Sequence, residues 1–344
     1  GWGGGPGFGY GRRRGLPARF TLCVDPRVEC VGLRPEECRV MASKKAPLWA
    51  AFEPADPCAR GPYVAIFKAG DDLRQDMITL QMLQLMDEIW LEESGADLAP
   101  TPYGCVATGK DLGMIEVVPS SRTISEIQQK YGGRIVGAFR SEPINLFLRE
   151  SCHSHTSKGQ TQRSLNVALS DTKDNFIRSC AGYCVATYML GIGDRHSDNI
   201  MVSTSGHLFH IDFGHFLGNF KSKFGIRRER APFVFTPEMK NVIENGDDER
   251  DNGDSYGKFK RLCCEAYNDI RRSANLFITL FQLMIPAQVP ELLSSRDVHY
   301  LQGQMRLRAD PEQASQHFEA EIRASLNSVS RRVDNFIHNL KVQH

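Results

Sequence analysis

The side chains best suited to chemistry are concentrated in one stretch near the middle of the chain. Residues 191–199 read GIGDRHSDN, and residues 210–215 read HIDFGH. Asp194, Asn199 and Asp212 carry hard oxygen atoms of the kind that Mg²⁺ prefers. His196 belongs to the residue type that titrates near neutral pH and can take a proton from a hydroxyl group. This stretch is therefore predicted to bind a divalent cation and to assist a proton transfer.

The segment between Asn199 and Asp212 is predicted to be a hairpin. Two short apolar runs, residues 200–202 and 207–211, flank a Thr-Ser-Gly turn at residues 204–206. A hairpin returns its second end beside its first, so Asn199 and Asp212 are expected side by side. An amide oxygen and a carboxylate placed together predict a magnesium site that phosphate oxygens complete. With Asp194 shortly upstream, this is the order of a kinase catalytic loop and its metal-binding Asp.

A basic segment follows the predicted metal ligand. Between His215 and Pro232 the basic residues outnumber the single acid Glu229, and they are Lys221, Lys223, Arg227, Arg228 and Arg230. Because this run follows Asp212 closely in the chain, it is expected near the place where the phosphate acceptor binds. Lys and Arg pair well with phosphate groups and with anionic membrane surfaces. The segment favours a phosphorylated inositol headgroup over a peptide hydroxyl as the acceptor.

The elements that must position these groups come earlier in the chain. Residues 63–68 form a predicted strand that ends at Lys68, and residues 70–77, GDDLRQDM, open an amphipathic helix that runs to Glu93. A strand lysine beside a helix that carries acids is the arrangement that holds the α-phosphate in kinases. Residues 103–109 and 112–119 are predicted to be two more strands joined by a turn.

Composition limits the classes of protein that remain. The chain has 344 residues, of which 41% are hydrophobic, and its net charge is +1. It can therefore build one large or two modest cores, and it is not a polycation steered to nucleic acid. Its ten cysteines form no Cys-x-x-Cys pair, and no signal peptide or apolar run of about 18 residues is present. We expect a reduced, intracellular protein.

Several segments are predicted to lie outside the catalytic machinery. Residues 1–17 are rich in Gly and Arg and are expected to be disordered, and we expect the chain to be the C-terminal part of a longer protein. Residues 151–172 are predicted to form a polar surface loop, and residues 245–254 an acidic loop without the spacing of an EF-hand. The basic helix at residues 331–340 is expected either to lie on a membrane or to pack on the helical part.

The whole pattern closely resembles the catalytic domain of phosphoinositide 3-kinases. Protein kinases read His-Arg-Asp, whereas this chain reads Asp-Arg-His at residues 194–196, with GDDLRQDM upstream and DFGHFLGNFKSKFGI at residues 212–226. The resemblance covers about residues 20–340. It implies an α+β, two-lobed protein-kinase-like fold with a small antiparallel-sheet N-lobe at 18–119 and a larger, mainly helical C-lobe at 120–344. The catalytic loop is then 191–199, and the activation loop is 212–236.

The resemblance also implies roles for individual residues. His215 would steady the γ-phosphate of ATP, and Asp76 would be a partner of Tyr103. The backbone of Glu116 and Val118 would bond the adenine edge. The full set of implied ATP contacts is Met41, Ser43, Lys45, Trp49, Lys68, Asp76, Tyr103, Ile115, Glu116, Val118, Met201 and Ile211. The implied lipid contacts are Lys221 and Lys223 at the 5-phosphate, and Arg227 and Arg228 at the 4-phosphate.

The implied reaction is transfer of the γ-phosphoryl group of ATP to the inositol 3-hydroxyl of phosphatidylinositol 4,5-bisphosphate. Mg²⁺, or alternatively Mn²⁺, would be the cofactor, and either Asp194 or His196 would take the hydroxyl proton. The activation loop looks like that of class I enzymes. Residues 231–236 and the C-terminus look more like those of class II enzymes, which would act on phosphatidylinositol or its 4-phosphate. An atypical protein serine/threonine kinase and an inactive scaffold are the further alternatives.

The resemblance implies partners as well. These are the phosphoinositide lipids of a membrane and a regulatory or adaptor subunit that binds outside this chain, with no nucleic acid. The expected location is the cytoplasm, with recruitment to the inner face of the plasma membrane or to endomembranes during phosphoinositide signalling.

Overall fold

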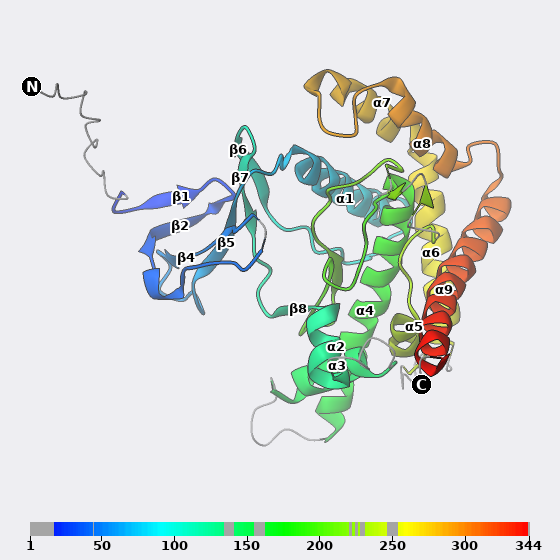
Figure 1. Cartoon of the computed structure of the whole chain (residues 1–344), viewed down its shortest axis with the longest axis horizontal. Coiled ribbons are helices and arrows are strands. Elements are labelled where there is room, and N and C mark those ends of the chain that lie inside the picture. The colour runs from blue at the N-terminus through cyan, green and yellow to red at the C-terminus, as the bar shows by residue number, and fades with distance from the viewer. Residues whose placement is uncertain are drawn as a thin grey trace, which may run out of the picture. The chain divides into compact units, whose positions relative to one another are not determined.

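The computed structural model describes residues 17–43, 45–133, 141–154, 162–219, 222–223, 226–227, 231–245 and 254–342 of the chain. The chain forms two compact units (Figure 1). The first comprises Gly1–Leu73 and Tyr103–Val117, and the second comprises Arg74–Pro102 and Val118–His344. Most of the Gly/Arg-rich segment at residues 1–17 therefore lies outside the described residues.

The first unit is built on an antiparallel sheet of seven strands. Six of them lie in the order β1 (Phe20–Leu22), β2 (Asp25–Leu33), β4 (Leu48–Pro54), β5 (Tyr63–Ala69), β7 (Leu112–Glu116) and β6 (Cys105–Gly109), while β3 (Arg39–Val40) pairs with β4. A short 3₁₀ turn, η1 (Pro35–Glu37), precedes β3. One face of the sheet buries Leu22, Val24, Cys30, Ala50, Phe52 and Ala65 in a common apolar core.

The second unit is mainly helical. Its helices are α1 (Arg74–Glu93), α2 (Ile124–Gly132), α3 (Pro143–Ser154), α4 (Gln162–Leu190), α5 (Pro237–Glu244), α6 (Ser255–Arg272), α7 (Ala274–Met284), η4 (Ile285–Ala287), α8 (Ser295–Met305) and α9 (Pro311–Val342). Strands β8 (Ser121–Thr123), β9 (Ile200–Ser203) and β10 (Leu208–His210) form a small sheet in the order β10-β9-β8. Strands β11 (Ser222–Lys223) and β12 (Ile226–Arg227) pair with each other.

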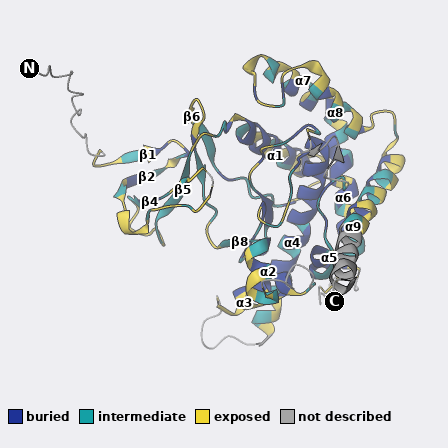
Figure 2. Ribbon diagram, viewed as in Figure 1, coloured by how far each residue is buried: buried dark blue, intermediate teal, exposed yellow. Residues whose placement is uncertain are grey.

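Helix α4 is the centre of the second unit, and its C-terminal half is buried on all sides (Figure 2). Gly182 allows the close approach of α1, because a Cβ there would lie 3.2 Å from Leu98 and 3.4 Å from the ring of Trp90. The Trp90 indole is fully buried and donates to Ala266 O of α6 at 3.0 Å. These contacts explain why α1 belongs to the helical unit, although the predicted N-lobe included it; the predicted lobe boundaries stay a prediction.

The α+β class predicted from the sequence is confirmed, and two local predictions change. The predicted loop at 151–172 is partly helical, because α3 continues to Ser154 and α4 already begins at Gln162. Polar residues join the end of a helix readily once a buried segment, here residues 176–190, has nucleated it. The basic helix predicted at residues 331–340 is the C-terminal part of the longer helix α9 (Pro311–Val342). No helix in the described part of the chain has the length and apolar character needed to cross a bilayer.

Glu238 is a buried acid at the start of α5 that links three helices. Its carboxylate accepts from Gln128 Nε2 of α2 at 2.7 Å and from the Ile144 backbone N–H of α3 at 3.3 Å. The side chain of Thr236 caps α5 by accepting from Met239 N at 3.2 Å. Burial raises the pKa of Glu238 to about 7. The folded state therefore favours the protonated form of this carboxyl group.

We expect Glu238→Gln to change how stability depends on pH. Because the pKa of Glu238 is raised in the folded state, this carboxyl group ionises in the unfolded state first as pH rises from about 4.5 to about 7. Ionisation therefore stabilises the unfolded wild type relative to the folded one in this window. The wild type should lose about 2–3 kcal/mol of unfolding free energy relative to the glutamine variant across this window, since one pKa unit corresponds to about 1.4 kcal/mol. Urea unfolding at pH 5, 6, 7 and 8 measures the difference, with the exposed Glu312→Gln as control. Parallel stability curves would contradict the assignment.

Candidate active site

The predicted hairpin is present and brings Asn199 and Asp212 to the same end. Strands β9 and β10 pair antiparallel with Ile200 opposite His210, and Ile211 N donates to Asn199 O at 3.0 Å. The buried Asn199 amide donates from Nδ2 to Asp194 O at 3.0 Å. This bond leaves the amide oxygen as the atom that can serve a cation. Asn199 and Asp212 thus lie next to each other in the backbone register, and each has a side-chain oxygen that could bind a metal ion.

Both aspartates of this region adopt a backbone conformation that side chains rarely take. The φ angle is +56° at Asp194 and +60° at Asp212. Left-handed conformations of residues other than glycine cost of the order of 1 kcal/mol and persist only where the surroundings hold them. Such strain in two carboxylate-bearing loops is typical of a functional site.

Arg195, for which the sequence predicted no role, holds these two loops together. Its guanidinium donates from Nε to Gly193 O at 2.9 Å and from Nη1 to Ile211 O at 2.7 Å, and Nη2 donates to Asp212 O. The guanidinium carbon also lies 5.7 Å from the centre of the Phe213 ring. The fixed fork of an arginine suits several carbonyls at once. Its place between Asp194 and His196 was the signal available in the sequence.

Two side chains in the first turn of α1 bind the backbone of Phe213, the residue after Asp212. Asp76 accepts from Phe213 N at 3.0 Å, and Gln75 Nε2 donates to Phe213 O at 2.8 Å. All three residues are buried. The structure therefore places Asp76, a predicted ATP contact, on the backbone of the Asp-Phe-Gly segment. Its predicted partner Tyr103 is buried in the first unit.

The two histidines of the site have different surroundings. The His196 side chain is half exposed, and its Nδ1 accepts from Asp198 N at 3.2 Å. The His215 side chain is partly buried, and its Nδ1 lies 2.6 Å from Glu291 Oε1. Gly193 N donates to His215 O at 2.9 Å, which joins the catalytic loop to the activation loop a second time. His215 is thus fixed at both its backbone and its ring.

A third histidine lies buried just before Asp212. The His210 ring stacks on Tyr183 with a centroid separation of 5.1 Å. Burial, helped by the nearby Arg195, holds the pKa of His210 well below its usual value. This imidazole is therefore neutral at physiological pH, and it adds no positive charge that would compete with a cation at Asp212.

In the first unit, the sheet register places three predicted ATP contacts on one face. Trp49 of β4 lies opposite Ile66 of β5, which lies opposite Ile115 of β7. Lys68 is two residues from Ile66 and therefore shares its face. Ala50 and Ala65, in the alternate positions, belong to the apolar core on the other face. The register thus groups Trp49, Lys68 and Ile115 on the face away from this core.

The turn between β3 and β4 carries the predicted phosphate contacts. Met41 N donates to Pro47 O and Ser43 N donates to Met41 O, both at 2.9 Å. Lys45 Nζ donates to Gly70 O at 2.7 Å and forms an ion pair with Asp71. The ammonium group predicted for phosphate therefore lies against a carboxylate of the GDDLRQDM segment.

The predicted adenine-binding strand ends where the chain passes from the first unit to the second. Glu116 N donates to Gly104 O, and the Glu116 carboxylate accepts from Gly104 N, both at 2.7 Å. No side chain fits at position 104, since a Cβ would lie 2.5 Å from Val24 O. The crossing falls between Val117 and Val118. Met201 and Ile211, the remaining predicted ATP contacts, lie in β9 and directly after β10 in the second unit.

The predicted lipid contacts are largely beyond the described structure. Lys221 and Arg228 lie outside the described residues. Lys223 in β11 and Arg227 in β12 are described in their backbone alone, in a ladder that pairs Lys223 with Ile226 and Ser222 with Arg227. Their predicted contacts with lipid phosphates stay predictions.

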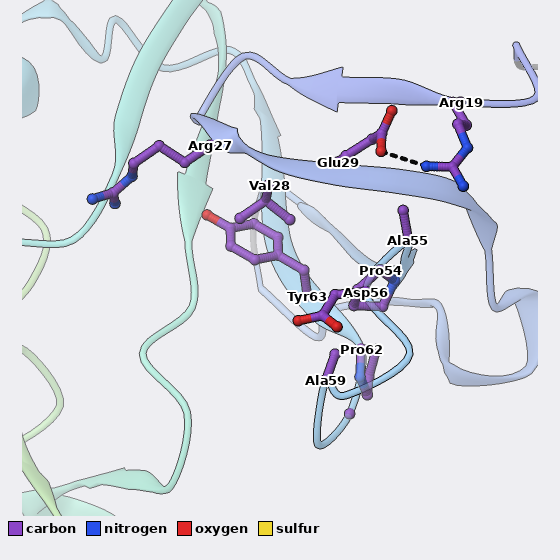
Figure 3. A pocket seen from close by; sticks show the side chains of 11 residues that line it. Arg19, Arg27, Val28, Glu29, Pro54, Ala55, Asp56, Ala59, Pro62 and Tyr63 are labelled. Carbon is purple, nitrogen blue, oxygen red and sulfur yellow. Dashed lines mark hydrogen bonds and ion pairs between the residues drawn. The ribbon is translucent and has the colours of Figure 1, made fainter.

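A pocket of about 520 Å³ in the first unit is a separate feature (Figure 3). Val28 and Tyr63 line it, and Arg19 and Glu29 form an ion pair of 2.6 Å at its edge. Tyr63 alternates with Lys68 along β5, so the tyrosine side chain lies on the opposite face of the sheet. This pocket is therefore distinct from the face that carries the predicted ATP contacts.

The residues present fit a hard divalent cation such as Mg²⁺ or Mn²⁺ better than they fit zinc. Among the described residues, no group of three or more His, Cys, Asp or Glu side chains could hold a metal. A zinc site would need three or four such ligands. Asn199 and Asp212 offer two hard oxygens, which is the usual protein share of a Mg²⁺ site that phosphates and water complete.

Comparisons with known proteins identify relatives of this chain. The family model described as "Phosphatidylinositol 3- and 4-kinase" matches residues 62–294. Phosphatidylinositol 3-kinases 1 and 2 of Dictyostelium discoideum are 46% and 45% identical over 94% of this chain, and the matches cover 20% and 16% of those proteins. The human phosphatidylinositol 4-phosphate 3-kinase C2 domain-containing subunit beta is 41% identical over 94% of this chain and 19% of its own length. The chain spans about a fifth of the length of these relatives.

We expect Arg195→Lys to loosen both loops of the site. A lysine keeps the charge but cannot reach three carbonyls in a fixed geometry. Hydrogen bonds from charged donors contribute about 1.5–3 kcal/mol each, so hydrogen exchange in residues 191–216 should become about 10- to 100-fold faster. Mass spectrometry of exchanged peptides measures this, with Arg323→Lys on the exposed surface of α9 as the matched control. Equal protection in the two variants would refute the anchoring role.

Proposed function

The chain belongs to the family of phosphatidylinositol 3- and 4-kinases, and we propose that it carries the activity of a phosphatidylinositol 3-kinase. Membership of this family implies a protein-kinase-like fold and the use of ATP with a divalent metal ion. The single observation that carries the proposal is the hairpin that sets Asn199 and Asp212 side by side and that Arg195 ties to the catalytic loop.

In the proposed reaction, the first unit supplies cations for the nucleotide phosphates. Lys68 neutralises charge on the phosphate chain, as the strand lysine of kinases does. Lys45 contributes a second ammonium group after ATP has replaced the Asp71 carboxylate as its partner. Trp49 and Ile115 share the face of Lys68 and provide apolar surface for the adenine.

The second unit supplies the groups around the transferred phosphoryl group. Asn199 and Asp212 would hold Mg²⁺, or alternatively Mn²⁺, which supplies positive charge to the phosphate oxygens. His215 steadies the γ-phosphate, and Asp194 or His196 takes the proton of the attacking hydroxyl. The hydrogen bond from Asp198 N to His196 Nδ1 leaves the neutral ring with its proton on Nε2. His196 must therefore change its hydrogen bonding before it can accept a proton at Nε2.

The proposed acceptor is phosphatidylinositol 4,5-bisphosphate, and the hydroxyl attacked is the 3-hydroxyl. The basic residues Lys221, Lys223, Arg227 and Arg228 support an acceptor with several phosphates. A second candidate acceptor is phosphatidylinositol or its 4-phosphate. The observation that favours it is the human relative at 41% identity, whose name specifies the 4-phosphate.

We further propose that the protein acts at the cytoplasmic surface of a membrane. The basic segment would be attracted to anionic lipids by about 1 kcal/mol for each basic residue near the surface. The relatives are about five times longer than this chain. A regulatory or adaptor subunit would accordingly bind through regions beyond it.

A lipid-kinase assay on vesicles of phosphatidylinositol, its 4-phosphate and its 4,5-bisphosphate tests the acceptor. We expect a 3-phosphorylated product, a loss of at least 100-fold in Asp212→Asn, and a preference for the bisphosphate that Lys221→Ala/Lys223→Ala selectively removes. Activity on phosphatidylinositol and its 4-phosphate alone would show that the second candidate, and not the bisphosphate, is the acceptor. Activity on a peptide panel but on no lipid would indicate a protein kinase. No turnover with any acceptor would favour the alternative that the protein is an inactive scaffold.

Single-turnover measurements on Asp194→Asn and His196→Asn distinguish the two candidate bases. General-base assistance contributes about 100- to 10,000-fold, so we expect the variant that lacks the base to slow the chemical step by at least tenfold. If both variants react within a few-fold of the wild type, neither residue is the base.

A further inference from the structure

Glu291 lies in the segment between η4 and α8, 76 residues after His215 of the activation loop, and it contacts that loop directly. We propose that Glu291 is a positioning residue for His215. It fixes which ring nitrogen of His215 carries the proton and so sets the atom that is presented to the transferred phosphoryl group. This inference rests on the proposed function for its kinetic consequence but not for its geometry.

The two oxygens of the Glu291 carboxylate contact two consecutive residues. Oε1 lies 2.6 Å from His215 Nδ1, and Oε2 accepts from Phe216 N at 2.8 Å. The side chains of His215 and Glu291 are 28% and 20% exposed, so water competes only partly for this pair. A bidentate contact of this kind fixes the direction of the carboxylate as well as its distance.

The backbone at Glu291 is held in a conformation that requires support. Its φ angle is +64°. The flanking residues Val289 and Leu292 are almost fully buried and form a bridge, with Leu292 N donating to Val289 O at 3.1 Å. Asn219 Nδ2 donates to Phe216 O at 3.1 Å and approaches Glu291 O at 3.4 Å. Local strain held in place by buried neighbours is typical of functional positions.

The helix that follows Glu291 packs against one glycine in each of the two loops. A Cβ at Gly191 or at Gly218 would lie 2.3 Å from the ring of Tyr300, which belongs to α8. Both glycines have positive φ, and Gly218 N donates to Gly191 O at 3.2 Å. Residues 289–300 therefore contact the start of the catalytic loop and the start of the activation loop. Glu291 thus belongs to a segment that contacts both loops.

The chemistry of the contact decides the tautomer. A carboxylate accepts hydrogen bonds, so His215 carries a proton on Nδ1 whether the ring is neutral or charged. Nε2 lies on the opposite side of the ring from this contact. A carboxylate behind an imidazole plays the same part in catalytic triads and metal sites.

The alternative is that Glu291 only anchors the loop through Phe216 N. Glu291→Gln separates the two readings. The glutamine oxygen can still accept from Phe216 N, while the amide nitrogen donates toward Nδ1 and favours a proton on Nε2. Asp297→Asn is the matched control, because the Asp297 carboxylate anchors the same segment by accepting from Leu293 N and Ser294 N.

Nitrogen NMR of histidine-labelled protein tests the proposal without any assay. With His215→Asn used to assign the signal, we expect neutral His215 to be protonated on Nδ1 in the wild type and in Asp297→Asn. We expect protonation on Nε2 in Glu291→Gln. Protonation on Nε2 in the wild type would overturn the proposal even if the variants failed to fold.

Single-turnover lipid phosphorylation then tests the consequence for catalysis. We expect Glu291→Gln to slow the chemical step at least tenfold with the KM for ATP within twofold, and Asp297→Asn to react within threefold of the wild type. In the His215→Asn background, Glu291→Gln should add less than a twofold loss. An equal loss in both backgrounds would refute action through His215. A wild type without lipid-kinase activity would refute the proposed function, and the NMR result would still decide the positioning role.

Discussion

The site depends first on the binding of three backbone carbonyls by the Arg195 guanidinium. Those carbonyls belong to Gly193 in the catalytic loop and to Ile211 and Asp212 at the end of the hairpin. The Arg195 side chain therefore joins the loop of the candidate base to the segment of the carboxylate predicted to bind the metal. Both Asp194 and Asp212 are in left-handed conformations, which persist only where the surroundings hold them, so this contact supports both loops.

Further contacts hold the Asp-Phe-Gly-His segment from two other directions. Gln75 and Asp76, in the first turn of α1, bind the backbone of Phe213. Glu291 binds His215 and the backbone of Phe216. The result is a segment in which each successive residue from 212 to 216, except the glycine, has a contact from a distant side chain. A phosphoryl-transfer site gains from such fixed geometry, because catalysis there consists mainly of positioning and charge stabilisation.

Two basic side chains lie near the predicted cation site, and the structure shows the state of each. Burial keeps His210 neutral, and the Arg195 guanidinium donates to the carbonyl oxygens of Gly193, Ile211 and Asp212. In the first unit, by contrast, Lys45 is paired with Asp71. In the proposed function, a nucleotide phosphate would replace the Asp71 carboxylate as the partner of Lys45.

The sequence alone determined the local parts of the site and their chemistry. The hairpin, the strands that carry Trp49, Lys68 and Ile115, and the helix α1 follow from periodicity and turn residues, which act between neighbours in the chain. The oxygen donors Asn199 and Asp212 follow from residue type. The family follows from the motifs, and the comparisons confirm it. The specific ATP and lipid contacts remain predictions.

Only the tertiary structure decided what holds those parts in place. Gln75, Asp76 and Glu291 act on residues 75 to 138 positions away in the chain, and no periodic pattern marks such pairs. The grouping of α1 with α4 and α6 depends on the fit of Trp90 over Gly182. The raised pKa of Glu238 depends on burial among three helices. Each is a property of packing, since burial and long-range hydrogen bonds exist only after the chain has folded.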